Sequence, residues 1–241
     1  MSTPGSTDQA SVEQLLRLGD SALVHGQRLS EWCGHGPALE EDIALTNIAL
    51  DCVGEARLLL ALAGAREGQG RDEDALAYLR DEAAFRNYTL VELPNGNGPH
   101  DDYAITVVRG FLHAALQVHL WPALAACADR ELAAIAARSI NEARAHLRHF
   151  GQWVVRLGDG TDLSHARIAS ALERLFPYTT NSGVATRWKR RLQPPAVVWW
   201  WRTSNPHGIR PSTPCWTKPV FPARPTAGSC PPASSGATAN T

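Results

Sequence analysis

The stretch AARSINEARAHLRHFGQWVVRL, residues 136–157, decides the fold class. Its apolar residues recur at alternating spacings of four and three, the pattern of a helix face that packs in an antiparallel bundle. They are Ala136, Ile140, Ala143, Leu147, Phe150, Val154 and Leu157. The glycine-rich and aspartate-rich segment 158–162 then ends the pattern, because such residues favour turns. The stretch therefore predicts a long bundle helix that packs through this one face.

Apolar spacings of three and four also predict helices on both sides of this stretch. They cover about residues 11–32, 39–65, 72–88, 102–128 and 162–176. In the second of these helices we expect a packed face made of Ile43, Leu50, Val53 and Leu60. The helix at 102–128 contains Pro122, where we expect a bend because proline removes a backbone hydrogen bond. Strand-like alternation is nearly absent, and four long helices with some long connections predict an all-α, ferritin-like bundle.

Charge divides the chain into two parts. Residues 1–180 contain all 24 acidic residues and 15 arginines but no lysine, which gives a formal charge of −9. Residues 181–241 contain eight basic residues and no acidic one, which gives +8. We therefore expect a disordered N-terminus at 1–10, a helical domain at 11–180 and a different kind of segment at 181–241.

The segment 181–241 shows no apolar periodicity and holds 10 of the 16 prolines and five of the eight tryptophans. Its composition is open to three interpretations: an irregular or disordered basic tail, a nucleic-acid-binding segment, or an out-of-frame translation of GC-rich DNA. We favour the frameshift, because disordered tails are poor in tryptophan and the basic residues have no fold to display them. The DNA sequence around codon 180 tests this interpretation.

Cysteine usage and the N-terminus predict a cytoplasmic protein. The five cysteines show no paired or metal-like spacing, which is typical of reduced thiols. The first residues, MSTPGSTDQA, have neither the basic nor the apolar region of a signal peptide. No stretch approaches the roughly 20 apolar residues of a membrane span, so we expect no membrane contact.

A dinuclear iron centre in such a bundle uses Glu-x-x-His pairs on two helices, and the chain contains none. The nearest substitute is Glu142 with His146 one turn later, followed by His149. The second helix carries Asn47, Asp51 and Glu55 on one stripe, without a histidine. We therefore expect no metal in this chain. A polar network should replace it, made of Asp51, Glu55, Glu142 and His146 together with Arg57 and Arg144.

His113 and Gln117 share a face of the third long helix, which we interpret as packing. No nucleophile elbow or phosphate-binding glycine loop is present, so hydrolase and nucleotide-binding functions have no support. Two function classes can be weighed on the residues alone. One is an independent ferritin-like metal-dependent oxidase or iron store, which the missing Glu-x-x-His pairs argue against, and the other is a helical adaptor.

Several motifs between about residues 14 and 180 resemble one protein family. They include Glu31-Trp32-Cys33-Gly34-His35, Pro94-Asn95-Gly96-Asn97, Glu142-Ala143-Arg144-Ala145-His146 and Arg156-Leu157-Gly158-Asp159-Gly160-Thr161-Asp162. Together they are similar to the structural C subunits of bacterial phenylacetyl-CoA epoxidases. The resemblance implies a ferritin-like bundle that has lost its di-iron ligands. Nothing after Thr180 resembles the helical ending of that family with its His-Thr-Glu motif.

The resemblance also implies partners and cofactors. A homologous catalytic subunit would hold the di-iron centre, a reductase subunit would supply electrons from NADPH, and the complex would add one oxygen atom to the ring of phenylacetyl-CoA. In the family, the stretch that matches Ala84, Phe85, Arg86 and Asn87 is associated with the CoA substrate. Phe85 and Asn87 fit the family pattern here, whereas Ala84 and Arg86 depart from it.

Overall fold

The computed structural model describes residues 6–96 and 102–181. The chain divides into two units, Met1–Leu192 and Gln193–Thr241, and all described residues belong to the first. Every regular element in the described ranges is a helix, which confirms the all-α prediction. Apart from Asn181, the tail predicted at 181–241 lies outside the described residues.

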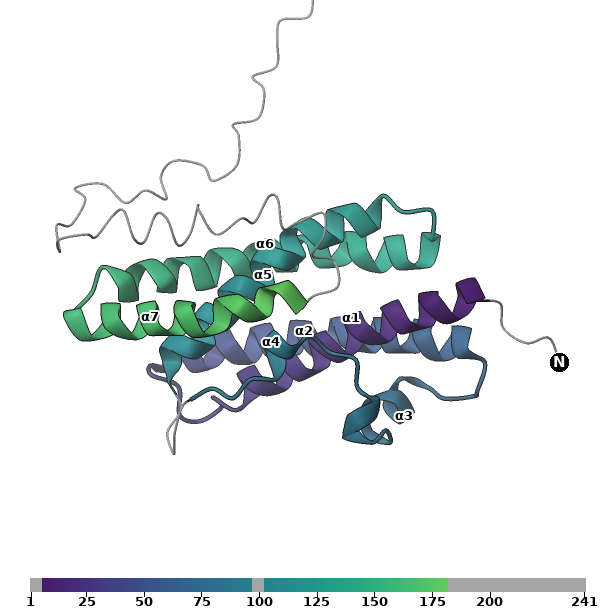
Figure 1. Cartoon of the computed structure of the whole chain (residues 1–241), viewed down its shortest axis with the longest axis horizontal. Helices are drawn as coiled ribbons and strands as arrows, with labels where there is room; N and C mark the ends of the chain where they lie inside the picture. The colour runs from purple at the N-terminus through teal and green to yellow at the C-terminus, as the bar shows by residue number, and fades with distance from the viewer. Residues whose placement is uncertain (1–5, 97–101, 182–241) are drawn as a thin grey trace, which may run out of the picture. The chain divides into compact units, whose positions relative to one another are not determined.

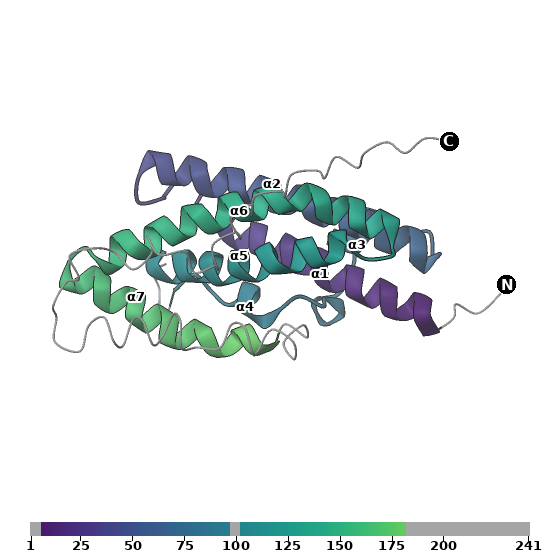
Figure 2. The same cartoon turned by 90° about the horizontal axis from the view of Figure 1, so that it is seen from above.

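Four long helices form the body of this unit and pair as neighbours in the chain (Figures 1 and 2). They are α1 (Ser6–Ser30), α2 (Leu39–Glu67), α5 (Tyr103–Ala125) and α6 (Arg130–Gly158). The closest helix pairs are α1 with α2 and α5 with α6, each joined by a short connection that makes its two helices antiparallel. A further helix, α7 (Asp162–Leu175), packs on α5 and α6 and ends in the 3₁₀ turn η2 (Phe176–Asn181). This is the ferritin-like bundle that the sequence predicts.

Helix ends follow the capping chemistry of the sequence. The side chains of Asp72, Asp129 and Thr161 accept hydrogen bonds from the first backbone N–H groups of the helices that follow them. Helix α2 is capped at its C-terminus by Gly68, which adopts a left-handed φ of 69°. Glycine adopts this conformation without strain because it has no side chain. The observed ends lie within a few residues of the predicted ones, except that α1 begins at Ser6, inside the segment expected to be disordered.

The prediction of a single helix at 72–88 is wrong. The structure has the short helix α3 (Glu73–Tyr78), the 3₁₀ turn η1 (Glu82–Ala84), extended residues and then α4 (Thr89–Glu92). Asp20 on α1 explains the break, because its carboxylate accepts hydrogen bonds from the Arg80 side chain and from the Arg86 backbone N–H. A continuous helix would use that N–H internally, so a contact with a residue 66 positions away overrides the local pattern.

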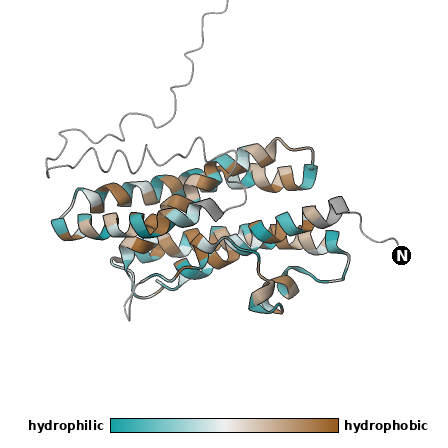
Figure 3. Ribbon diagram, viewed as in Figure 1, coloured by the Kyte–Doolittle hydropathy of each residue, from teal (hydrophilic) through white to brown (hydrophobic). Residues whose placement is uncertain are grey.

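The buried row of α6 differs in part from the predicted face. Apolar residues run along every long helix (Figure 3), but the α6 side chains that face the interior include two polar ones. The row is Leu132, Ala136, Ser139, Ala143, His146, Phe150 and Val154. Ala136, Ala143, Phe150 and Val154 confirm the prediction, whereas Ile140, Leu147 and Leu157 are only partly buried. The helix is rotated so that Ser139 and His146 point inward.

The face predicted for α2 is wrong for three of its four residues. Leu60 is buried, but Ile43, Leu50 and Val53 are 53 %, 63 % and 40 % exposed. The face of α2 that packs inward instead carries Leu45, Ile48, Ala49, Cys52, Glu55, Ala56, Leu59 and Ala63. Because α2 is apolar on both sides, spacing alone does not show which side meets the core.

A glycine sets the distance between α5 and α6. A Cβ atom on Gly110 would lie 2.5 Å from the ring of Phe150, so only glycine permits this approach. Further along α5 the helix continues through Pro122 to Ala125. The bend expected at that proline stays a prediction.

Candidate functional site

Six polar side chains from the four long helices are buried in the interior of the bundle, and we call them the polar centre. They are His25, Glu55, His113, Gln117, Ser139 and His146. Each is less than one tenth exposed. Because a buried polar group costs free energy unless it is paired, such a cluster marks a candidate site.

Glu55 is a carboxyl group without a cationic partner in this centre. The Gln117 amide donates a hydrogen bond of 3.2 Å to Glu55 Oε1. Burial raises the pKa of Glu55 to about 8, and the nearby carboxylates of Glu142 and Asp51 add to the effect. The hydrogen bonds from Ser139 and Gln117 oppose it. Glu55 is therefore protonated at neutral pH.

His25 and His113 form a ring pair within the polar centre. Their ring centroids are 4.4 Å apart and tilted by 52°. Burial, and then neighbouring positive groups, lower the pKa of His113 to about 3 and lower that of His25 well below its usual value. Neither ring nitrogen of His113 has a hydrogen-bond partner among the described residues, nor does Nδ1 of His25. Both histidines are therefore neutral at physiological pH.

The structure brings part of the predicted polar network together. His146 Nε2 lies 2.9 Å from Asp51 Oδ2, which links α6 to α2. Glu142 is close enough for the Asp51 charge to raise its pKa, although burial contributes more. Arg57 does not take part, because its side chain is 74 % exposed and pairs with Glu73 at 3.3 Å.

Arg144 also lies outside the network, on the exposed side of α6. The expectation that Arg57 and Arg144 belong to the network is therefore wrong, and burial keeps Glu55 neutral. Whether Asp51, Glu55, Glu142 and His146 replace a metal centre stays a prediction.

The residues at this place do not fit a pair of irons. Such a site needs several ionised carboxylates and two histidines that converge. Oε1 of Glu55 is occupied by the Gln117 amide, while His146 is engaged with Asp51. Within residues 6–96 and 102–181, no group of three or more His, Cys, Asp or Glu side chains is arranged to hold a metal ion.

Sequence reasoning missed His25 and Ser139, although a signal for both exists. His25 continues the row Leu18, Ala22, Leu29 at helical spacing, and Ser139 lies between Ala136 and Ala143 on α6. Polar residues inside an apolar row are the mark of a buried polar site. A pattern that counts only apolar residues misses both positions.

The stretch that the resemblance associates with the CoA substrate is held by a buried ion pair. Arg80 and Asp20 are paired with side chains 4 % and 0 % exposed, and the Arg80 guanidinium lies 4.4 Å from the centre of the Phe85 ring. The Asn87 amide donates a hydrogen bond of 2.8 Å to Glu92. Ala84 and Phe85 are half-buried and Arg86 is exposed. These contacts hold the backbone of the stretch, and its role toward a substrate stays a prediction.

Two of the quoted motifs meet at Asn95. Its amide nitrogen donates to the Arg28 carbonyl at 2.9 Å and to Glu31 at 2.7 Å. Its amide oxygen accepts a hydrogen bond of 3.0 Å from Thr106, which in turn accepts one of 2.9 Å from the Trp32 indole. The fully buried Arg109 also donates to this oxygen. These motif residues therefore fasten the loop after α4 to α1 and α5, which is a structural task.

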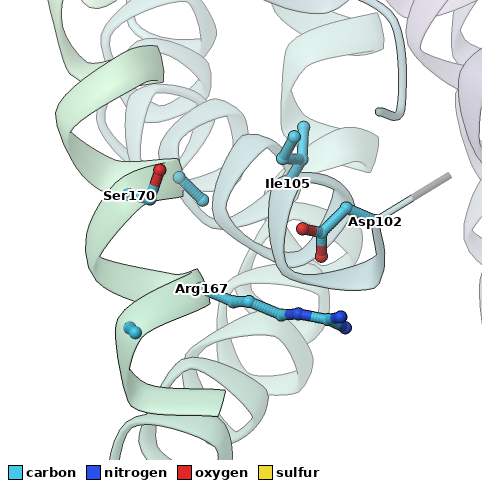
Figure 4. Close-up of a pocket in the computed structure, with 6 residues that line it drawn as sticks. Asp102, Ile105, Arg167 and Ser170 are labelled. Atoms are coloured by element: carbon cyan, nitrogen blue, oxygen red, sulfur yellow. The ribbon is translucent and has the colours of Figure 1, made fainter. Parts of the chain in front are cut away.

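A shallow hollow of about 190 Å³ lies away from the polar centre, between the start of α5 and α7 (Figure 4). Arg167 extends across it from α7 toward the end of α5 that carries Asp102. The other lining residues are Ile105, Ala166, Ser170 and Ala171. Ligand sites usually enclose at least roughly 300 Å³, so this hollow is too small for an acyl-CoA.

Comparison with known proteins gives two matches. A family described as phenylacetic acid catabolic protein matches residues 1–205. A protein of Escherichia coli (strain K12), named as the C subunit of 1,2-phenylacetyl-CoA epoxidase, is 49 % identical over 164 residues, which are 68 % of this chain and 64 % of that protein. The chain thus spans somewhat under two thirds of the length of this relative.

Among the described residues, no helix is long and apolar enough to cross a membrane.

Proposed function

Because the chain belongs to the phenylacetic acid catabolic protein family, we propose that it is the structural, non-catalytic subunit of a multicomponent oxygenase that epoxidises phenylacetyl-CoA. The observation that carries the proposal is the 49 % identity over 164 residues to a protein named as the C subunit of such an epoxidase. The family motifs of the sequence, which fasten the bundle together at Asn95, agree with it.

The interior of the bundle supports a non-catalytic role. An oxygenase that activates O₂ at two irons needs ionised carboxylates between its helices. Here the polar centre has Glu55 as its single carboxyl group, bonded to the Gln117 amide, and His25 and His113 as a ring pair. For the same reason the alternative, an independent ferritin-like oxidase, has no specific observation in its favour.

The proposal includes the partners that the chemistry requires. A homologous subunit holds the di-iron centre, which supplies the oxygen-activating chemistry, and a reductase delivers electrons from NADPH. This chain contributes no cofactor of its own. Its task is to bind the catalytic subunit, with phenylacetyl-CoA bound at the complex.

Reconstitution tests the proposal. The purified chain, the di-iron catalytic subunit and the reductase are combined with phenylacetyl-CoA, NADPH and O₂, and the epoxide and NADPH consumption are measured. We expect no product from this chain with the reductase, and turnover only when the catalytic subunit is added. We further expect the catalytic subunit to lose activity when this chain is left out.

Oxygen-dependent consumption of the thioester by this chain and a reductant alone would contradict the proposal. So would full activity of the catalytic subunit without this chain. The full-length chain, including residues 182–241, is used in every arm, so that the protein is tested as it exists.

A further inference from the structure

Three aromatic side chains from separate elements meet at one end of the bundle, and we call them the aromatic row. They are Trp32 in the turn that follows α1, Tyr103 at the start of α5, and Trp153 on α6. The ring centroids of Trp32 and Tyr103 are 5.4 Å apart, and so are those of Tyr103 and Trp153. Both pairs meet edge to face, so neighbouring rings are in direct contact. Because the gaps between them are short, electrons can tunnel from one ring to the next.

The row leads from the interior to the surface. Trp32 is only 6 % exposed, whereas Tyr103 and Trp153 are half-buried. The guanidinium of Arg156 lies 5.3 Å from the centre of the Trp153 ring. This contact favours the neutral ring, but the positive charge disfavours a radical cation there by Coulomb repulsion. Trp153 is therefore accessible to an oxidant in solvent but is a poor place for an electron vacancy to remain.

Tyr103 differs from the tryptophans because its proton meets a carboxylate. The phenol donates a hydrogen bond of 2.7 Å to Glu41 Oε2, which is within the reach of direct proton transfer. His149 Nε2 lies 3.3 Å from the same oxygen and can share the proton. Burial, and then the hydrogen bond and charge of Glu41, raise the pKa of Tyr103. The phenol therefore keeps its proton until the ring loses an electron, which turns it into a strong acid.

Trp32, at the other end of the row, is less suited to hold a vacancy. Its indole N–H donates a hydrogen bond of 2.9 Å to the Thr106 hydroxyl, which is not a base at neutral pH. A radical cation at Trp32 would keep its positive charge in the interior, where burial penalises charged groups. Of the three rings, Tyr103 is thus the one on which oxidation leaves a neutral product.

We propose that the aromatic row is a path for one-electron oxidation, along which an electron vacancy that forms on Trp153 passes to Tyr103 and is held there as a tyrosyl radical. A one-electron oxidant first takes an electron from Trp153 and leaves its radical cation. Tyr103 then gives an electron to Trp153, which becomes neutral again, and the phenolic proton moves to Glu41 Oε2. The products are the reduced oxidant, a neutral tyrosyl radical and protonated Glu41, so that electrons and charge balance.

This activity goes beyond the proposed function. Only its physiological source of oxidant rests on that function, because a complex that activates O₂ is exposed to species that take single electrons. Holding the vacancy on a phenol near the surface keeps it away from the core of the bundle.

Photochemical oxidation of the full chain tests the path. Light and an electron acceptor convert tris(bipyridine)ruthenium(II) into the ruthenium(III) complex, which takes single electrons from aromatic side chains. The radicals are followed by transient absorption and electron paramagnetic resonance. Every protein carries Tyr78→Phe and Tyr178→Phe, which leaves Tyr103 and the buried Tyr88 as the tyrosines. We expect a tyrosyl radical in this parent protein and its loss in Tyr103→Phe.

Two further variants test the entry point and the proton acceptor. Trp153→Phe removes the oxidisable ring at the surface, and Glu41→Gln keeps a hydrogen-bond acceptor that does not take up the proton. We expect each to lose most of the tyrosyl signal. The matched controls are Trp121→Phe, a tryptophan outside the row, and Glu40→Gln, an exposed carboxylate next to Glu41 in sequence. Both controls should keep the signal, and circular dichroism melting checks that every variant is folded.

A parent protein without a tyrosyl radical, or a signal that persists in Tyr103→Phe, would overturn the inference. An undiminished signal in Trp153→Phe or Glu41→Gln would do the same, since the path or its proton acceptor would then be wrong. The assay contains this chain alone, so these outcomes leave the proposed function standing, and reconstitution with the catalytic subunit tests that function separately.

Discussion

Glu55 is a buried carboxyl group that remains uncharged in the interior of this bundle. Its carboxyl group is enclosed by side chains from other helices and is bonded to the Gln117 amide, 62 residues away. Its pKa rises to about 8 chiefly because burial penalises the ionised form. At the scale of single residues, Glu55, His25 and His113 of the polar centre are therefore neutral.

This protonation predicts a pH-dependent stability. The folded chain holds a proton on Glu55 that the unfolded chain releases above its usual pKa of 4.5, so stability falls as pH rises from about 4.5 to 8. Each unit of pKa shift corresponds to about 1.4 kcal/mol, which makes the total a few kcal/mol. Glu55→Gln keeps the hydrogen-bonding shape without the titration. We expect its free energy of unfolding in urea to fall less than that of the wild type when the pH is raised from 5 to 9.

The exposed Glu40→Gln serves as the control for removing one carboxylate. The comparison uses the difference between each variant and the wild type, because other groups also titrate in this range. If Glu55→Gln and the wild type lose stability in parallel up to pH 9, Glu55 is ionised in the folded chain and the assignment is wrong.

At the scale of elements, the segment between α2 and α5 depends on one buried ion pair. Arg80 and Asp20 are almost completely buried, and together they hold α3, η1 and the extended residues against α1. Removal of one partner of such a pair leaves an uncompensated charge in the interior.

Arg80→Met should therefore destabilise the chain by roughly 3–5 kcal/mol, measured as the free energy of unfolding in urea. Arg57→Met removes an exposed arginine, whose pair is worth at most about 1 kcal/mol. The double variant Asp20→Asn/Arg80→Met should recover part of the loss, since no charge stays buried. An Arg80→Met variant as stable as Arg57→Met would show that this ion pair does not hold the segment.

At the scale of the whole molecule, the polar centre and the family together predict that this chain carries no stoichiometric iron. The chain is purified after expression in iron-rich medium, and its metal content is measured by mass spectrometry. The di-iron catalytic subunit, prepared in the same way, is the positive control. We expect far less than one iron per chain, and close to two irons per chain with a di-iron spectrum would overturn the expectation.

The sequence predicts the long elements of the fold because their determinants are local. Apolar spacing defines α1, α2, α5, α6 and α7, and aspartate or threonine caps place several of their ends. The glutamate and histidine spacing also shows that no Glu-x-x-His pair is available. Of the candidate network, Asp51 and His146 could be named in advance, since they are polar residues on helix faces that meet in a bundle.

What the sequence by itself determined is thus the helical class, the family motifs and the absence of the usual iron-ligand pairs, because each is written in neighbouring residues. Only the tertiary structure decided which side of α2 faces the core, that no continuous α-helix runs through 79–88, and that Glu55 meets Gln117 rather than an arginine. The physical reason is the same in each case. These features depend on contacts between residues 60 or more positions apart, or on a choice between two apolar faces, and the free energy of burial decides them only when the helices are packed together.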